Sequence, residues 1–377
     1  MRNIIKSILL ALLVLLSPNF IHASKQAKMA KKSGEIRIKD VSPHKGLNLN
    51  YNYGEMELVF WDKNEIVLKY DECVRASSQK RADEILQKRI AIKSIEGHYF
   101  RVGNADDSSV SFNSKWTVYV PSHISSVAAS NSFGNITVGK GFSGLIRIDV
   151  QNGDVNIPET KAMCVVEVTH GNFYVGNAAY LNMTTKHANG TISFAQTLKV
   201  QAEHADFCKI DKADVMTINS KHSKIKVGNV GQLSSQGSYS TLEVNKLSGL
   251  ANIRDMQHST IEMGDFWGKL DATDLSYSKL NITISKFNHT PFIMVTDLDY
   301  TDVKVKLPAS LRTSTYVNGK GSCRSISSGT AKIKSSAPWS SPNGVSTHVF
   351  QNTESFTPNS LIDINNESYG TILIEEY

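Results

Sequence analysis

A short motif that recurs along the middle of the chain constrains the fold more than any other feature. It consists of an aromatic residue, His or Asn, then Gly, Ser or Thr, then a polar residue, and then two aliphatic residues separated by one position. Successive copies between Phe133 and Tyr300 begin 16 to 23 residues apart. The clear copies begin at Phe133, Asn152, His170, Asn189, His222, Tyr239, His258, Tyr277 and Tyr300; a weaker copy begins at Ala205, and outlying copies begin at Tyr53 and Tyr369.

The spacing inside each copy predicts a strand with one buried face. Aliphatic residues lie two apart, as in Leu242 and Val244, with a polar residue such as Glu243 between them. The repeat is too short for a strand–helix–strand unit, and no helical pattern separates the copies. The sequence therefore predicts an all-β chain whose residues 125–310 form a single-stranded parallel β-helix, or β-solenoid, with rungs of about 17–20 residues.

The first two positions of the motif predict the corner between successive strands. Gly tolerates positive φ in a tight turn, and Ser or Thr can hydrogen-bond to the turn backbone. If every rung turns at the same place, the residues that begin the motif stack into one column of rings and amides along the solenoid. We expect rungs about 4.8 Å apart.

The flanking segments follow other patterns. Residues 35–124 are expected to be strands and a capping helix continuous with the solenoid, with two strands meeting at a turn over residues 62–64 and the helix over residues 77–89 after Ser residues that can cap it. Residues 311–377 hold a Ser/Gly-rich insertion, which predicts a long loop or a mobile segment, and a terminal strand near Tyr369.

The N-terminus has the layout of a secretory signal peptide over residues 1–23. Arg2 and Lys6 precede an apolar run that is too short to span a bilayer, and Ala23 supplies a small residue before the expected cleavage site. Residues 24–34 predict a flexible basic arm. The chain is therefore expected to be exported, to the periplasm, the outer-membrane surface or the extracellular space, with no transmembrane helix in the mature part.

Charge and cysteine usage restrict the partners. The formal charge of +6 falls to +4 without Arg2 and Lys6, and both signs are interspersed, so a nucleic-acid partner is not expected. Four cysteines, in no metal-binding spacing, allow three disulfide pairings that the sequence does not distinguish: Cys73, Cys164, Cys208 and Cys323. Cys208 takes an aliphatic position of the repeat, which suits a buried free thiol equally well.

The order of these parts resembles a known family. A YGEMELVFWDKNEIVL stretch leads to the short helix, then to WTVYVP, then to the repeats SNSFGNITVG and VQNGDVNI. In this order the chain is similar, over nearly all of its mature length, to the bacterial putative adhesin family of unknown function, the β-strand-repeat envelope proteins related to the head GIN domain. The resemblance implies an exported envelope protein with a parallel β-helix or β-roll, and it offers no catalytic residues. The Ser-rich insertion departs from the family pattern.

Two groups of residues have side chains that could bind a metal ion. His170, His222 and His258 take the first motif position, and His187 and His204 lie near it. Because Phe, Asn and Tyr take the same position in other copies, it is interpreted as a stacking position and not as a metal site. Asp297, Asp299 and Asp302 offer calcium ligands but lack the spacing of an EF-hand or a calcium-binding β-roll.

Paired acids were weighed as a catalytic centre, because β-helices host polysaccharide lyases and glycosidases. The candidate pairs are Asp149 with Asp154 and Asp271 with Asp274. No serine-hydrolase, zinc-protease or phosphate-loop motif occurs. The sequence therefore predicts no catalytic residue, cofactor site or metal ligand.

The predicted function is that of an exported, non-catalytic scaffold, adhesin-like, which presents a long polar surface to a cell-surface protein, a glycan or another copy of itself. Two alternatives stay open. One is a carbohydrate-active β-helix enzyme, and the other is a periplasmic structural or envelope-stress component.

Overall fold

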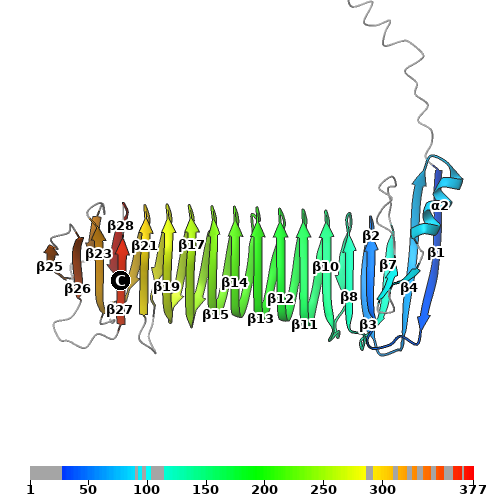
Figure 1. Cartoon of the computed structure of the whole chain (residues 1–377), viewed down its shortest axis with the longest axis horizontal. Coiled ribbons are helices and arrows are strands. Elements are labelled where there is room, and N and C mark those ends of the chain that lie inside the picture. Colours follow the sequence, from blue (N-terminus) through cyan, green and yellow to red (C-terminus); the bar gives the residue numbers. More distant parts are fainter. Residues whose placement is uncertain are drawn as a thin grey trace, which may run out of the picture.

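The computed structural model confirms the β-solenoid. It describes residues 28–89, 92–95, 99–102, 114–285, 292–308, 313–320, 325–328, 334–340, 345–351, 360–366 and 369–377. The described strands form one continuous hydrogen-bonded sheet that is wound into a rod (Figure 1). The predicted signal segment and Cys323 lie outside the described residues.

The N-terminal elements come first along the chain. They are β1 (Lys28–Lys39), β2 (Gly46–Tyr51), β3 (Glu55–Trp61), β4 (Glu65–Ala76), α2 (Gln79–Arg89), β5 (Ile92–Ile95), β6 (Tyr99–Val102) and β7 (Lys115–Pro121). The expected turn over residues 62–64 joins β3 to β4.

The rungs of the rod are built from the middle of the chain. Their strands are β8 (Ser126–Asn131), β9 (Ile136–Val138), β10 (Leu145–Gln151), β11 (Val155–Thr169), β12 (Asn172–Lys186), β13 (Asn189–Glu203), β14 (Cys208–Lys221), β15 (Lys224–Ser238), β16 (Thr241–Leu247), β17 (Leu250–Gln257), β18 (Thr260–Phe266), β19 (Lys269–Ser276), β20 (Lys279–Thr283), β21 (Phe292–Asp299) and β22 (Asp302–Leu307).

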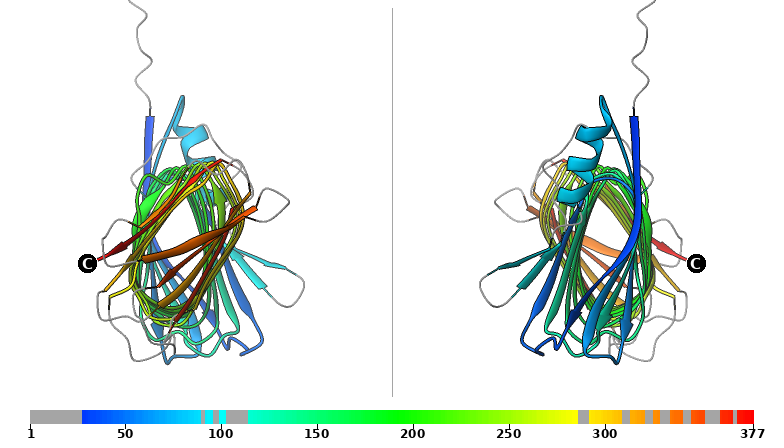
Figure 2. Two further views of the ribbon diagram at one scale, coloured as in Figure 1. Left: turned by 90° about the vertical axis from the view of Figure 1, so that its left-hand side faces the viewer. Right: turned by 90° about the vertical axis from the view of Figure 1, so that its right-hand side faces the viewer.

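The rod has two long faces, seen end-on in Figure 2. We call first face the strands that directly follow the corner formed by the first two motif residues. They are β3, β9, the first halves of β11 to β15, and then β16, β18, β20 and β22. The second face consists of β2, β8, β10, the second halves of β11 to β15, and then β17, β19 and β21. Within both faces neighbouring rungs pair in parallel, so that β15 pairs with β16 through its first half and with β17 through its second.

The core lies between the two faces. Alternate residues of every rung point inward, and those of one rung, such as Leu242, Val244 and Ile253, are almost fully buried. Burying each such side chain contributes about 1.5–3 kcal/mol. A single rung has no core of its own, so it becomes stable only when stacked on its neighbours.

At the N-terminal end the chain leaves the simple stacking order. The β2–β3 rung stacks directly on β8 and β9, while β4 runs antiparallel to β7 and β1 runs antiparallel to β4. Among the described strands β1 pairs only with β4, and its exposed Lys31, Lys32 and Lys39 discourage edge-to-edge association. Residues 28–34, expected in a flexible arm, form the first part of β1.

The helix α2 packs on these outermost strands, as a capping element should. Ser78 caps it, since the backbone N–H of Arg81 donates to Ser78 Oγ at 3.2 Å. Its apolar side, Ala82, Ile85 and Leu86, is buried in a small cluster with Ala30 of β1 and Val74 of β4.

A buried, hydrogen-bonded carboxylate connects the N-terminal strands to the first rungs. The carboxylate of Glu72 is 2% exposed and accepts hydrogen bonds from Ser114 Oγ and from the indole N–H of Trp116. Trp116 also packs against the rings of Tyr51 and Tyr70. The acid is therefore a satisfied structural group.

The C-terminal end departs from chain order in the same way. The chain first forms β23 (Thr313–Lys320), β24 (Ser325–Ser328), β25 (Lys334–Ser340) and β26 (Val345–Gln351), and then returns as β27 (Ser360–Asn366) and β28 (Thr371–Glu376). β27 lies between β21 and β23, and β28 lies between β22 and β24. The Ser/Gly-rich segment thus contains strands, where the sequence predicts a loop, because pairing with β27 and β28 compensates for its weak apolar pattern.

We expect Gly153→Ala to destabilise the rod. An added Cβ would lie 2.1 Å from the backbone oxygen of Gly134 on the preceding rung, so the two rungs would have to separate. The predicted cost is about 1–3 kcal/mol, measured by denaturant unfolding. Ala188→Gly, at a corner that already holds a Cβ, is the matched control and should cost less than about 1 kcal/mol.

Candidate functional site

The predicted column of rings runs along one edge of the rod. Nine side chains stack on one another with ring centroids 4.8 to 5.2 Å apart: His170, His187, His204, His222, Tyr239, His258, Tyr277, Tyr300 and Tyr369. Tyr53 and Phe133 stack in the same way at 4.8 Å. The outlying motif copies at Tyr53 and Tyr369 are therefore genuine rungs.

The corner backbone explains which residues take this position. From His170 to Tyr300 the stacked residues have φ between 47° and 55°, and Asn152 has φ of 54°. This left-handed conformation is unfavourable for a residue with a side chain, and Asn and His adopt it more readily than most. Stacking on both sides offsets part of that cost.

Two motif assignments were wrong. The copies aligned on Asn189 and Ala205 actually turn at His187 and His204, which are members of the column and not its neighbours. Both histidines are followed by Ala, which fills the corner as Gly or Ser does elsewhere. A ring followed by any small residue is the signal that would have found them.

The stacked geometry limits the chemistry of the column. Each inner ring has both faces covered by neighbours, so only ring edges meet solvent, and a sugar has no ring face to stack on. Parallel imidazoles do not converge on one point, as a metal site requires. In the part of the chain that the structure describes, no group of three or more His, Cys, Asp or Glu side chains could hold a metal ion. The column is structural.

A second column, of buried hydroxyls, lies directly behind the rings. Ser223, Ser240, Ser259 and Ser278 each donate through Oγ to the carbonyl two residues earlier, at 2.8 to 2.9 Å. Each hydroxyl also accepts the corner N–H of the preceding rung, at 3.1 to 3.3 Å. Thr301 closes the series at its C-terminal end. These hydrogen bonds satisfy corner groups that point away from the strand ladders.

We expect Ser259→Ala to destabilise the rod by about 1–2 kcal/mol, because it leaves the buried N–H of Ser240 without its acceptor. Ser234→Ala is the control, since that serine is exposed on the second face and its loss should change stability by less than about 0.5 kcal/mol. Equal effects in urea unfolding would contradict the hydroxyl column's role.

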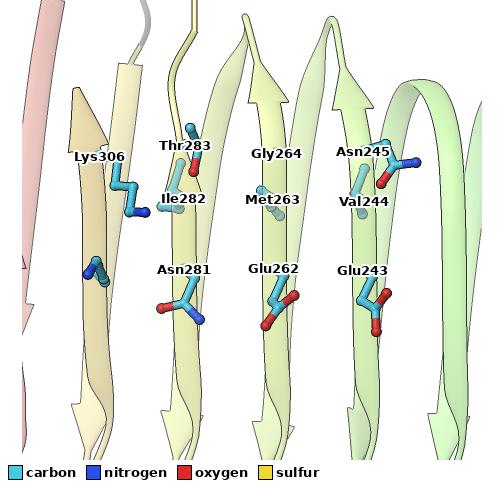
Figure 3. A pocket seen from close by; sticks show the side chains of 11 residues that line it. Glu243, Val244, Asn245, Glu262, Met263, Gly264, Asn281, Ile282, Thr283 and Lys306 are labelled. Carbon is cyan, nitrogen blue, oxygen red and sulfur yellow. The ribbon is translucent and has the colours of Figure 1, made fainter. Parts of the chain in front are cut away.

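The first face carries a shallow polar hollow of about 380 Å³ (Figure 3). It opens where Gly264 presents no side chain between Asn245 and Thr283 of the neighbouring rungs. Its further lining comes from Glu243, Glu262, Asn281, Lys304 and Lys306. Amides, carboxylates and ammonium groups thus meet in one place on the first face.

The charged side chains that line this hollow differ in whether they already form an ion pair. Glu243 binds Lys224 and Lys226 at 2.8 and 2.7 Å, and hydrogen bonds from these two lysines lower the pKa of its carboxyl. Lys304 pairs with Glu375 at 2.8 Å. Glu262 and Lys306 form no ion pair with the described side chains, so they are the charges most open to a ligand.

The acid pairs considered from sequence are not brought together as catalytic pairs. Asp149 lies on the second face, whereas Asp154 lies at the corner of the first face, where it accepts the backbone N–H of Asn172 at 2.8 Å. Asp271 lies near Arg254 at 3.5 Å, and Asp274 has left-handed φ beside Thr273.

Sequence reasoning missed a different pair. Asp149 lies in register with Glu167 on the next rung. Burial, followed by the charge of Glu167, raises the pKa of the Asp149 carboxyl. A rung-by-rung alignment of the second face would have shown it.

The aspartates considered as calcium ligands, which the sequence does not predict to bind a metal, form structural hydrogen bonds. Asp297 has φ of 54° and accepts a hydrogen bond from Thr273 Oγ1 at 3.0 Å. Asp302 accepts the backbone N–H of Thr371 at 3.0 Å.

Cys73, Cys164 and Cys208 are free thiols, and the latter two are fully buried on different faces. Burial raises the pKa of Cys164 to about 12 and that of Cys208 to about 12. The folded chain therefore keeps both as unreactive thiols.

We expect Cys164 and Cys208 to resist a disulfide reagent near pH 8 and to react after unfolding, which a thiol titration measures. In the unfolded chain they ionise near pH 9. Their contribution to stability is present below pH 9 and is lost as pH rises from 9 towards 12. Rapid reaction of either thiol in the native chain would contradict their burial.

No protein-family model matches the chain, and no curated protein matches it in sequence. Among solved structures, the chain is similar to a putative cell adhesion protein from Clostridium sporogenes, at 10% identity over 93% of this chain and 100% of that chain, with a TM-score of 0.21. Similarity at that level carries neither family nor function to this chain. No helix within the described residues is both long and apolar enough to cross a membrane.

Proposed function

We propose that the protein is an exported, non-catalytic scaffold that binds another macromolecule along the first face of its rod, in the manner of an adhesin. The observation that carries the proposal is a row of outward residues on this face, one per rung, which are polar at every rung except that of Tyr174. Thr137, Asn156, Thr191, Lys226 and Glu262 belong to this row, and each is held by a rigid parallel ladder.

A row of this kind suits an extended ligand. Contacts that recur at every rung are individually weak but add up along a repetitive partner such as a glycan or an extended polypeptide. Because the rungs are rigid, binding requires little ordering of the protein.

The hollow at Gly264 is the proposed point of strongest contact. It is concave, and it offers amide, hydroxyl and charged groups that converge on one place. Glu262 and Lys306 both line it and carry opposite charges. A ligand with hydroxyl groups and charges of both signs would be matched best.

Export and membership of the adhesin-like family are part of this proposal. They rest on the signal-like N-terminus and on the order of motifs along the sequence. The enzymatic alternative has less support, because Asp149 and Asp154, considered as a catalytic pair, lie on different faces of the rod.

We expect the purified protein to bind surface glycans or whole cells saturably and to release no product. Glu262→Lys and Lys306→Glu should each weaken binding by about tenfold or more, because each reverses a charge at the hollow. Lys186→Glu, on the exposed second face, is the charge-matched control and should bind normally.

A glycan array measures binding, and a reducing-sugar assay run in parallel measures cleavage. Release of cleaved glycan would contradict the non-catalytic proposal. Normal binding by both hollow variants would move the site away from Gly264.

A further inference from the structure

An exposed apolar row on the second face is not explained by the fold. Two adjacent rows run along this face, one residue per rung. We call row A the residues Leu145, Met163, Tyr180, Thr197, Val215, Gln232, Leu250, Lys269 and Phe292. We call row B the residues Arg147, Val165, Asn182, Lys199, Thr217, Ser234, Asn252, Asp271, Met294 and Asp363.

Row A concentrates large apolar side chains in solvent. Five of its members are 40–45% exposed: Leu145, Met163, Tyr180, Val215 and Leu250. Most other large exposed apolar residues of the described chain belong to the ring column, whose faces are already covered by stacking. Row A has no such covering. Its large apolar side chains therefore meet water along the rod, with Thr197, Gln232 and Lys269 between them.

Row B carries charges of opposite sign at its two ends. Arg147 and Lys199 lie towards the N-terminal end, and Asp271 and Asp363 lie towards the C-terminal end. A second copy turned end to end, about an axis parallel to the strands, places row A on row A and row B on row B. Arg147 of one copy then faces Asp363 of the other, and Met163 faces Phe292. In the middle of the row the side chains of the two copies interdigitate, with Val215 opposite Gln232, Leu250 opposite Thr197 and Tyr180 opposite Lys269.

Two unsatisfied polar atoms lie in the same row. Asn182 Oδ1 and Asp363 Oδ1 are buried without a hydrogen-bond partner among the described residues. Burial raises the pKa of the Asp363 carboxyl. The rest of the Asp363 side chain is half-buried, and a facing guanidinium from Arg147 would supply the opposite charge that it lacks.

We propose that the second face is the interface of an antiparallel homodimer, formed by rows A and B of two copies. The two rods match because their rungs have the same spacing, which a globular partner does not share. Ten rungs give a contact about 43 Å long and, for two rows, about 14 Å wide. That is about 600 Å² on each copy, below the roughly 800 Å² of a standard interface, so dimerisation in the micromolar range is expected.

The arrangement leaves the first face free. Both hollows at Gly264 then point outward from the pair, so the dimer would be bivalent towards a repetitive surface. The dimer does not depend on what the first face binds.

Sedimentation velocity of the purified full chain, from about 1 to about 200 µM, tests the proposal. We expect a concentration-dependent dimer. Met163→Glu and Val215→Glu should each weaken dimerisation at least tenfold, and Tyr174→Glu, an equally exposed residue of the first face, should leave it unchanged. Circular dichroism identifies any variant that fails to fold. If one row-A variant fails to fold, the dimerisation of the other tests the proposal.

Charge reversal tests the proposed contact between Arg147 and Asp363 directly. Arg147→Asp and Asp363→Arg should each weaken the dimer, and the double variant R147D/D363R should restore it. A chain that remains monomeric over the whole range would overturn the proposal. So would a dimer that persists in both row-A variants, or a double variant no tighter than the single ones.

Discussion

In-register stacking of parallel rungs is the constraint on which the whole structure depends. Each rung is too small to hold a core, so its apolar residues are buried only when the rungs above and below present theirs at the same height. Every corner must then repeat the same conformation. The ring column and the hydroxyl column are the two means by which the chain achieves this, one by stacking an unfavourable corner residue and the other by satisfying the corner N–H.

The same register orders the surface. Outward side chains form straight rows at the rung spacing, so any property that recurs in the sequence becomes a line along the rod. On the first face this produces polar rows and, at Gly264, a hollow. On the second face it produces a row rich in large apolar side chains beside a row whose charge changes sign from end to end. The two faces are thus suited to different partners, a ligand and a second copy.

The fold could be predicted because alternation such as Leu242-Glu243-Val244 indicates a strand with one buried face. In addition, a ring before a small residue marks each corner. The register at His187 and His204 was missed, since Ala at the corner was not recognised and only pairing in space reveals it. The pairing of β27 with β23 and of β28 with β24 could not be predicted either, because a local sequence pattern does not show which rungs are neighbours. The hollow depends on the absence of a side chain at Gly264, which gains meaning only from its neighbours.

A distance measurement along the rod tests the register most directly. Thr137 and Asn281 lie in one row of the first face, eight rungs apart by the chain of strand pairings, although 144 residues separate them. Spin labels at these two positions, read by pulsed electron resonance, should give a narrow distribution near 38 Å at about 4.8 Å per rung. A broad distribution, or one centred more than about 10 Å away, would contradict the continuous in-register stack.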